Sequence, residues 1–370
     1  MSAYKIKKLF RFILIYGLSR AIIKSLGRLR LHLPVKVFYD LRPFRRPGVH
    51  VGLVGAGQHA FSSIAYFLSR YTRSHFDFVI DPLKEAGQSF AVAFSSNAYE
   101  DLTSLEKSNQ KTPNIVYIAS NHSSHVDYAT YFINKNCDIF IEKPIAISLG
   151  QLSKLDNALK SIPVSIFAGY NRPFSPAIAR LKSRFNKDSP LSLNCSVVGH
   201  FIPSDHWYRD SGEGTRVVAN IGHWIDLAVH LLFQKSSRPT FLEINYCISN
   251  PVTISDNVSL TITSSHGDLI NIFFTSRGEP FEGVSELILF QQDNLIAKIY
   301  DFRKMEIWSD DEYKSYKYAP KDNGHKNCIL QPFFGKPSRP WPELYFSTRL
   351  MLDIEKLALS HQRYLKVELP

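Results

Sequence analysis

The chain of 370 residues is 44% hydrophobic, 13% aromatic and 21% charged, which is the composition of a globular protein with room for two ordinary domains. The net charge of +11 is confined to residues 1–47, which hold twelve Lys or Arg and a single acid, so the rest of the chain is neutral. This distribution disfavours a nucleic-acid-binding protein, and the varied composition excludes a fibrous or low-complexity one.

Residues 1–47 form a basic, apolar extension in which we expect a helix over residues 5–30. Its uninterrupted apolar run, residues 12–18, is far shorter than the roughly 20 residues that span a bilayer. No small-residue cleavage site follows, which argues against a signal peptide. Three interpretations remain: peripheral attachment of residues 5–30 to the inner, cytoplasmic face of a membrane, a helix packed on the protein's own core, and a transit peptide.

An apolar strand at residues 49–54 runs into a Gly-x-Gly-x-x-Ala turn, and a helical pattern follows. In such a turn Gly55 reverses the chain, Gly57 lets the backbone approach a pyrophosphate, and Ala60 lets helix pack on strand. The helix start offers free N–H groups to the phosphates. A second strand, residues 76–80, ends in Asp81, at the offset of a carboxylate that binds ribose hydroxyls. The pattern predicts a dinucleotide site that prefers NAD to NADP; the alternative is a turn that binds nothing.

Two further strands also end in polar loops. Residues 115–119 precede the polar stretch 120–125, and residues 138–141 precede Glu142-Lys143-Pro144. Ligands of open α/β sheets bind at the carboxyl ends of the strands, so we expect both loops to face the dinucleotide. Together these elements predict an α/β Rossmann dinucleotide-binding domain over residues 48–168.

Four motifs in this order resemble the Gfo/Idh/MocA oxidoreductases: the glycine turn, Asp81, Ala-x-Asn-x-x-His at 119–125 and Glu-Lys-Pro at 142–144. The resemblance runs from about Val49 to the C-terminus and leaves the extension unexplained. It implies that Lys143 lies beside the nicotinamide, where its ammonium polarises a reacting substrate hydroxyl; the alternative is an exposed loop lysine. It also suggests a cis peptide bond before Pro144. The NAD-binding residues that we expect are Gly55, Gly57, Gln58, His59, Asp81, Asn121, His125, Glu142 and Lys143.

Residues 169–370 have the strand pattern of a second, α+β domain. Strands are expected at 191–198, 240–247, 257–263, 269–275, 285–290, 295–299 and 304–308, with a closing helix at 343–359 and a last strand at 363–368. Their alternation predicts a large, mainly antiparallel sheet with one covered face. The resemblance implies that this domain binds substrate and forms homodimers or homotetramers through the exposed sheet face.

A helix following the loop at 205–214 carries His223 and Asp226. The resemblance implies that this helix faces the cofactor and that His223 is the general acid/base, a role that suits its titration near neutral pH. The alternative is a histidine packed within the fold, and we expect Asp226 to be structural. The substrate contacts that we expect are Tyr170, Arg172, His206, Trp207 and Asn220.

The usual family pattern has an Asp four residues before the histidine, where this chain has Ala219. In one branch, similar to modules that follow zinc alcohol-dehydrogenase-like halves, an acid lies three residues before it, where this chain has Asn220. An amide hydrogen-bonds but cannot take up the proton. We therefore expect slow turnover, an altered acid/base set or a loss of hydride transfer.

The four cysteines are far apart in the sequence and have no metal-ligand spacing, so we expect no metal site and buried thiols of a reducing compartment. They are Cys137, Cys195, Cys247 and Cys328.

These features favour a cytoplasmic NAD(P)-dependent oxidoreductase. It would transfer a hydride between nicotinamide and a carbinol carbon of a sugar, nucleotide sugar or polyol, with surface polysaccharide biosynthesis as one setting. The alternative is a catalytically impaired dinucleotide-binding protein with a regulatory or scaffold role.

Overall fold

The computed structural model describes residues 3–40, 46–250, 252–335 and 337–369; residues 1–2 and 41–45 of the extension lie outside this range. The chain forms two units. One, here called the Rossmann unit, comprises residues 17–169 and 325–341. The other, here called the sheet unit, comprises residues 1–16, 170–324 and 342–370.

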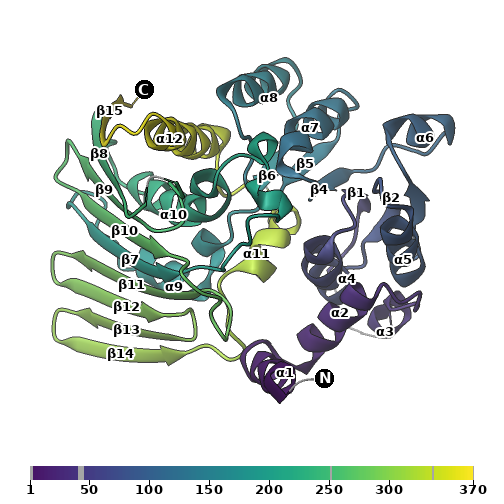
Figure 1. The fold of residues 1–370 in the computed structure, drawn as a ribbon, viewed down its shortest axis with the longest axis horizontal. Helices are drawn as coiled ribbons and strands as arrows, with labels where there is room; N and C mark the ends of the chain where they lie inside the picture. Colours follow the sequence, from purple (N-terminus) through teal and green to yellow (C-terminus); the bar gives the residue numbers. More distant parts are fainter. Residues whose placement is uncertain (1–2, 41–45, 251, 336, 370) are drawn as a thin grey trace. The chain divides into compact units, whose positions relative to one another are not determined.

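The Rossmann unit contains a parallel sheet of six strands in the order β3-β2-β1-β4-β5-β6 (Figure 1). Its central strands are apolar and almost wholly buried, as in parallel sheets covered on both faces. The order reverses between β1 and β4, which is the point where such sheets bind ligands. The strands are β1 (His50–Val54), β2 (His75–Ile80), β3 (Asn97–Tyr99), β4 (Ile115–Ile118), β5 (Asp138–Ile141) and β6 (Ile166–Ala168).

Helices connect these strands. A π-helical segment, Ala60–Ala65, follows the glycine turn and continues into α4 (Tyr66–Tyr71). The side chain of Asp101 caps α6, and that of Ser148 caps α8, by accepting a backbone N–H bond. The remaining helices are α5 (Lys84–Phe94), α6 (Leu102–Lys107), α7 (His125–Ile133), α8 (Leu149–Ser161) and α11 (His325–Ile329).

Residues 325–341, expected in the C-terminal domain, lie instead with the Rossmann unit. Tyr117 on β4 donates a hydrogen bond to the Ile329 carbonyl at 2.8 Å. The amide of Gln331 donates to the Ala168 carbonyl of β6 at 3.1 Å. These buried bonds join segments far apart in sequence, which explains why the local pattern did not reveal the pairing.

The sheet unit contains nine strands in the order β14-β13-β12-β11-β7-β10-β9-β8-β15. Every neighbouring pair is antiparallel except β7 and β10, which confirms the mainly antiparallel sheet. β14 was not expected, because its residues are polar and mostly exposed and show no alternation. The strands are β7 (Ser192–Val198), β8 (Phe241–Ile248), β9 (Val258–Ser264), β10 (Leu269–Thr275), β11 (Ser285–Gln292), β12 (Leu295–Tyr300), β13 (Lys304–Ser309), β14 (Glu312–Lys317) and β15 (Tyr364–Glu368).

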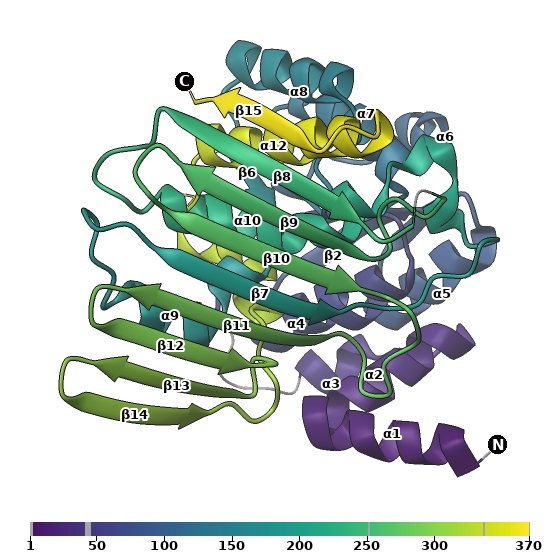
Figure 2. The ribbon, with the colours of Figure 1, turned by 60° about the vertical axis from the view of Figure 1, so that its left-hand side comes forward.

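One face of this sheet is covered by α10 (Gly222–Leu232) and α12 (Trp341–Leu359). The short α9 (Pro176–Lys182) lies near β7 and β11. Figure 2 shows the opposite face, which no helix of the sheet unit crosses. Alternating residues of β8 point to that bare face, and this places Cys247 in an exposed position. The expectation that all four thiols are buried was therefore wrong for Cys247, whereas Cys137, Cys195 and Cys328 are buried.

The expected helix of the extension is present but broken at Gly17, whose φ is +88°. Its first part, α1 (Ala3–Tyr16), belongs to the sheet unit, where Ile15 accepts a backbone bond from Lys321 at 2.8 Å and Arg11 pairs with Glu282. Its second part, α2 (Leu18–Leu29), and the short α3 (Lys36–Asp40) belong to the Rossmann unit. No helix within the described residues is long and apolar enough to cross a membrane.

Candidate functional site

The glycine turn after β1 has the geometry of a phosphate cradle. Gly55 has a φ of +88°, and a Cβ at this position would lie 2.5 Å from the Ala119 carbonyl oxygen, so only glycine fits. A Cβ on Gly57 would meet nothing within 4 Å, which means that open space adjoins the turn. Because this space lies at the carboxyl end of β1, where the strand order reverses, the turn fits the pyrophosphate of a dinucleotide.

Asp81 follows β2 and is held against the same turn. Its Oδ2 accepts the Ala56 N–H at 2.7 Å, and its Oδ1 accepts the Leu83 N–H at 2.8 Å. Each carboxylate oxygen has a second lone pair, so acceptor capacity remains after these two bonds. The carboxylate is therefore fixed in place by backbone amides while it keeps the means to bind a ribose hydroxyl.

The loops after β1 and β5 are joined by a contact between a histidine and a glutamate. His59 Nε2, at the start of the helix after the glycine turn, lies 3.0 Å from Glu142 Oε1. Burial raises the pKa of Glu142, but the His59 pair together with the Lys143 charge outweighs burial, so the pKa lies below its usual value. Lys143 is half-buried, and its peptide bond to Pro144 is cis, as expected.

His125 is buried between two loops. Its Nδ1 lies 2.7 Å from the Pro144 carbonyl oxygen, and its Nε2 lies 3.1 Å from that of Ser120. Burial is the main cause that lowers the pKa of His125. These contacts tie the loop after β4 to the Glu-Lys-Pro loop, so the geometry gives His125 a positioning role, while Asn121 is exposed in the same loop.

In the sheet unit, His223 is the second residue of α10. Of the eleven residues of this fully described helix, it is the one that is not buried. Its ring meets the Tyr170 ring edge-on, with 6.4 Å between centroids, and the buried Tyr170 hydroxyl lies 3.3 Å from the Met351 sulfur. Asp226 is fully buried and accepts a hydrogen bond from Ser347 at 2.8 Å, a structural contact.

Arg172, an expected substrate contact, lies in a buried network. Its guanidinium forms a two-point ion pair with Glu286, at 2.8 and 3.2 Å. The Trp224 indole donates to the same carboxylate at 2.9 Å, and the guanidinium carbon lies 4.2 Å from the Trp224 ring centroid. This network attaches the start of α10 to β11. It also neutralises the Arg172 charge within the fold, through Glu286.

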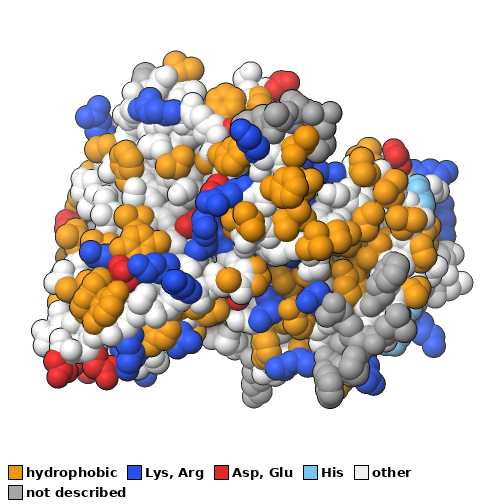
Figure 3. All heavy atoms as spheres, turned by 90° about the horizontal axis from the view of Figure 1, so that it is seen from below, with side chains coloured by type: hydrophobic (Ala, Val, Ile, Leu, Met, Phe, Trp, Pro, Cys, Tyr) orange, Lys and Arg blue, Asp and Glu red, His pale blue; other side chains and the backbone are white. Residues whose placement is uncertain are grey.

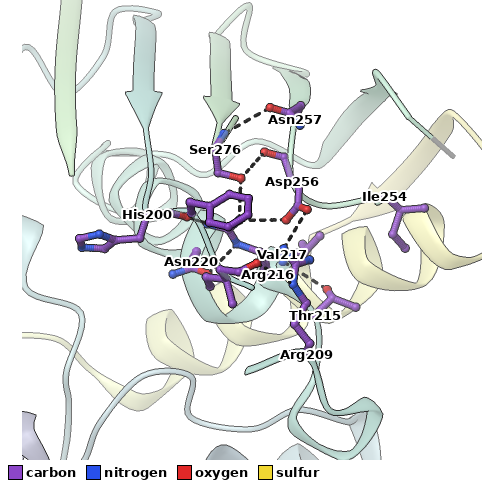
Figure 4. Close-up of polar contacts among 12 residues, drawn as sticks. His200, Arg209, Thr215, Arg216, Val217, Asn220, Ile254, Asp256, Asn257 and Ser276 are labelled. Carbon is purple, nitrogen blue, oxygen red and sulfur yellow. Dashed lines mark hydrogen bonds and ion pairs between the residues drawn. The ribbon is translucent and has the colours of Figure 1, made fainter. Parts of the chain in front are cut away.

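Asn220 is held by an arginine that the expected site residues did not include (Figure 4). Arg216 is 2% exposed, and its Nε donates to Asn220 Oδ1 at 3.1 Å. Its Nη1 contacts Asp256 at 2.9 Å and Ser276 at 2.6 Å. Burial lowers the pKa of Arg216, and the Asp256 pair opposes this. The Gly-x-Arg pattern at 214–216, just before the His223 helix, was the available sequence signal.

The loop before this helix also presents an exposed aromatic pair. The rings of His206 and Trp207 are stacked with centroids 5.9 Å apart, and both side chains are exposed. Arg209 of the same loop donates to Asp256 Oδ2 at 2.9 Å, which connects the loop to the Arg216 network.

One group of potential metal ligands occurs among the described residues, at the amino ends of β1 and β2. The Nδ1 atoms of His50 and His75 lie 2.7 and 3.2 Å from Asp77 Oδ1. The two imidazoles are largely exposed and already paired with the carboxylate, and the group lies at the opposite end of the strands from the glycine turn. We assign no metal to it.

Comparison with known proteins supports the fold and the presence of a Rossmann domain. Residues 49–170 match the model of the Gfo/Idh/MocA family, described as an oxidoreductase family with an NAD-binding Rossmann fold. Over 188 residues the chain is 24% identical to glucose-6-phosphate 3-dehydrogenase of Bacillus subtilis (strain 168), a match that covers 49% of this chain and 51% of the relative. The chain thus matches about half the length of this curated relative.

Two of the similar solved structures show how much of the fold is shared. Levoglucosan dehydrogenase in complex with NADH has a TM-score of 0.71 at 16% identity, over 87% of this chain and 99% of that one. UDP-N-acetylglucosamine 3-dehydrogenase from Acidithiobacillus ferrooxidans has a TM-score of 0.66 at 15% identity, over 85% and 98% of the two chains. Residues 49–170 therefore form an NAD-binding Rossmann domain of the Gfo/Idh/MocA oxidoreductase family.

Proposed function

We propose that this protein is an NAD-dependent dehydrogenase that acts on a CH–OH group of a sugar, nucleotide sugar or polyol. The observation that carries the proposal is the open glycine turn with Asp81 fixed against it, at the reversal point of a parallel sheet. The names of the relatives support the substrate class: one is a glucose-6-phosphate 3-dehydrogenase and another a levoglucosan dehydrogenase.

Each cofactor group has a matching element in the Rossmann unit. The glycine turn would hold the pyrophosphate, and Asp81 would accept hydrogen bonds from a ribose hydroxyl and repel a 2′-phosphate, which favours NAD. When bound, the nicotinamide would take up a hydrogen and its electron pair from the carbinol carbon. Gln58 and His59 follow the same turn directly, and Glu142 contacts it through His59.

Lys143 and His223 are the proposed catalytic residues. The Lys143 ammonium would donate to the substrate oxygen and lower the cost of its developing negative charge. His223 would take the hydroxyl proton. The alcohol would thus lose a C–H hydrogen with both electrons to NAD⁺ and an O–H proton to the His223 imidazole, and it would become a carbonyl. The partial exposure of His223 on an otherwise buried helix supports this role.

Substituting Lys143 tests the catalytic assignment. Lys143→Ala should abolish NADH production from a sugar or nucleotide-sugar panel and leave the Kd for NADH unchanged, because the ammonium is assigned to the reacting oxygen. Lys84→Ala, at an exposed position at the start of α5, is the matched control. Undiminished turnover by Lys143→Ala would contradict the assignment.

The second candidate function is a dinucleotide-binding regulatory or scaffold protein without turnover. The observation that favours it is the pair Ala219 and Asn220 at the positions of the family's acid, with Ala219 buried. NADH binding without turnover of any panel alcohol would support this candidate over the dehydrogenase.

We also propose that the extension attaches the protein peripherally to a membrane. Hydrophobic side chains of α1 and of α2 are exposed in a segment rich in Lys and Arg, and Figure 3 shows hydrophobic side chains lying among Lys and Arg on one face of the molecule. Such a surface binds anionic lipid by partial insertion and charge attraction. A membrane-held enzyme would suit nucleotide sugars destined for surface polysaccharides. Flotation with anionic vesicles tests this, and equal recovery in the soluble fraction with and without them would contradict it. The exposed apolar residues are Ile6, Leu9, Phe10 and Leu14 on α1 and Leu18, Ile22 and Leu29 on α2.

A further inference from the structure

The second helix of the extension is attached to the nucleotide-binding helix along its whole length. At its start, the Ser19 hydroxyl lies 2.8 Å from the Tyr66 hydroxyl, in α4. In its middle, the Gln58 amide donates to the Lys24 carbonyl at 2.9 Å. Gly27 lies so close to the Phe61 ring that a Cβ would be 2.9 Å from it. α2 therefore has one defined position against the helix that follows the glycine turn.

Arg30 follows the last turn of α2 and turns back toward the glycine turn. Its backbone is left-handed, with φ 51° and ψ 36°, a conformation that residues other than glycine seldom adopt. Its Nη1 donates to the Ala56 carbonyl at 2.7 Å. Ala56 lies between Gly55 and Gly57, so the extension places a half-exposed guanidinium on the turn that would hold the pyrophosphate.

The remaining donors of Arg30 suit a phosphate. A guanidinium has five N–H groups, and within the described chain the Ala56 carbonyl is the acceptor that it bonds. Arginine binds phosphate oxygens through paired, charge-assisted hydrogen bonds. The glycine turn by itself offers backbone N–H groups and a helix dipole but no full positive charge.

We propose that Arg30 binds the pyrophosphate of the dinucleotide, so that the extension forms part of the cofactor site. This inference rests on the proposed NAD-dependent function. The pyrophosphate is a better match than a 2′-phosphate, because Asp81 accepts the Ala56 N–H and would repel an anion at the ribose end.

A fluorescence titration with NADH tests the proposal on four proteins: the unmodified full-length chain, Arg30→Ala, Arg30→Lys and Arg28→Ala. Loss of a charge-assisted contact should raise the Kd of Arg30→Ala by about tenfold or more. Arg30→Lys should recover part of this, and Arg28→Ala, at an exposed position on the same helix, should match the unmodified chain. Added salt should weaken NADH binding less in Arg30→Ala than in the unmodified chain.

A second variant distinguishes the effect of the Arg30 charge from the effect of the packing of α2 on the Rossmann unit. Ser19→Ala loosens the far end of α2 but leaves Arg30 in place, so its Kd should stay unchanged even if its melting temperature falls. An unchanged Kd for Arg30→Ala would overturn the proposal and leave Arg30 as a mere tether of α2. Tighter binding by Arg30→Ala would also overturn it, because Arg30 would then obstruct the site. If the unmodified chain does not bind NADH, the proposed function itself fails, and this inference fails with it.

Discussion

Arg216 determines which end of the Asn220 amide is presented to a ligand. A guanidinium donates hydrogen bonds and accepts none, so the Asn220 oxygen faces Arg216 and the amide nitrogen faces away. The chain therefore offers a donor at the position where the one branch of the family has an acid, which would offer an acceptor. In the proposed reaction this leaves proton exchange to His223 without help from a neighbouring carboxylate at this position.

Replacement of His223 should therefore affect chemistry and not cofactor binding. His223→Ala is expected to lower kcat by about 10²–10⁴-fold, the range of general acid/base catalysis, at an unchanged Kd for NADH. His266→Ala, in the turn between β9 and β10, serves as the control. Steady-state kinetics together with an NADH titration provide the measurement, and a kcat equal to that of the unmodified protein would exclude His223 as the base.

The buried His125 should make stability depend on pH. Burial lowers its folded-state pKa below the ordinary value of 6.5, so the folded state binds a proton less readily than the unfolded chain does. Its contribution is then fully present above 6.5 and is lost as the pH falls from 6.5 through the folded-state pKa. The free energy of unfolding in urea should fall over this range more steeply for the unmodified protein than for His125→Gln. Parallel pH profiles of the two proteins would contradict this.

At the scale of an element, substitutions at the two glycines of the turn should affect different properties, one the stability of the fold and the other NADH binding. Gly55→Ala combines a positive φ with a close approach to Ala119, so it should destabilise the fold by at least about 2 kcal/mol. The Cβ of Gly57→Ala meets open space, so the free energy of unfolding should change by less than about 1 kcal/mol. The same Cβ occupies space in the proposed pyrophosphate site, so NADH binding should weaken. Urea unfolding and NADH titration of both variants check this; equal destabilisation would refute the assignment of the open space.

Elements with a strong local signal could be predicted from the sequence, and elements without one could not. The buried strands β1, β4 and β5 are continuous apolar runs, and buried and exposed residues alternate along β7 and β11. Both patterns identify strands in the sequence. β14 lacks alternation because it is exposed on both faces. The strand β3 has only three residues and is largely exposed, so it produces no recognisable hydrophobic pattern.

The site followed the same rule. The glycine turn, Asp81 and Lys143 lie in recognisable local motifs. The contacts of Arg30 with Ala56 and of Arg216 with Asp256 join residues 26 and 40 positions apart, and only the fold brings these residues together. Arg172 has the type expected of a substrate contact, but its partner Glu286 lies 114 positions away, so its burial in an ion pair was not visible in the sequence.

At the scale of the whole molecule, the bare face of the nine-stranded sheet is the proposed oligomer interface. Four apolar side chains on three adjoining strands are 38 to 47% exposed there: Phe273 on β10, Val198 on β7, and Leu287 and Leu289 on β11. Exposed apolar patches of this kind mark contacts between subunits. Leu289→Glu should reduce the molar mass measured by light scattering after gel filtration, and Val92→Glu, at an exposed position on α5, should not. A monomeric unmodified protein would contradict this interface.

The most direct test of the central claim is a fluorescence titration of the full-length protein with NADH and, separately, with NADPH. The open glycine turn and the fixed Asp81 carboxylate predict micromolar binding of NADH and clearly weaker binding of NADPH. Binding of neither dinucleotide would show that the chain keeps the family's fold without its cofactor, and would contradict the proposed dehydrogenase.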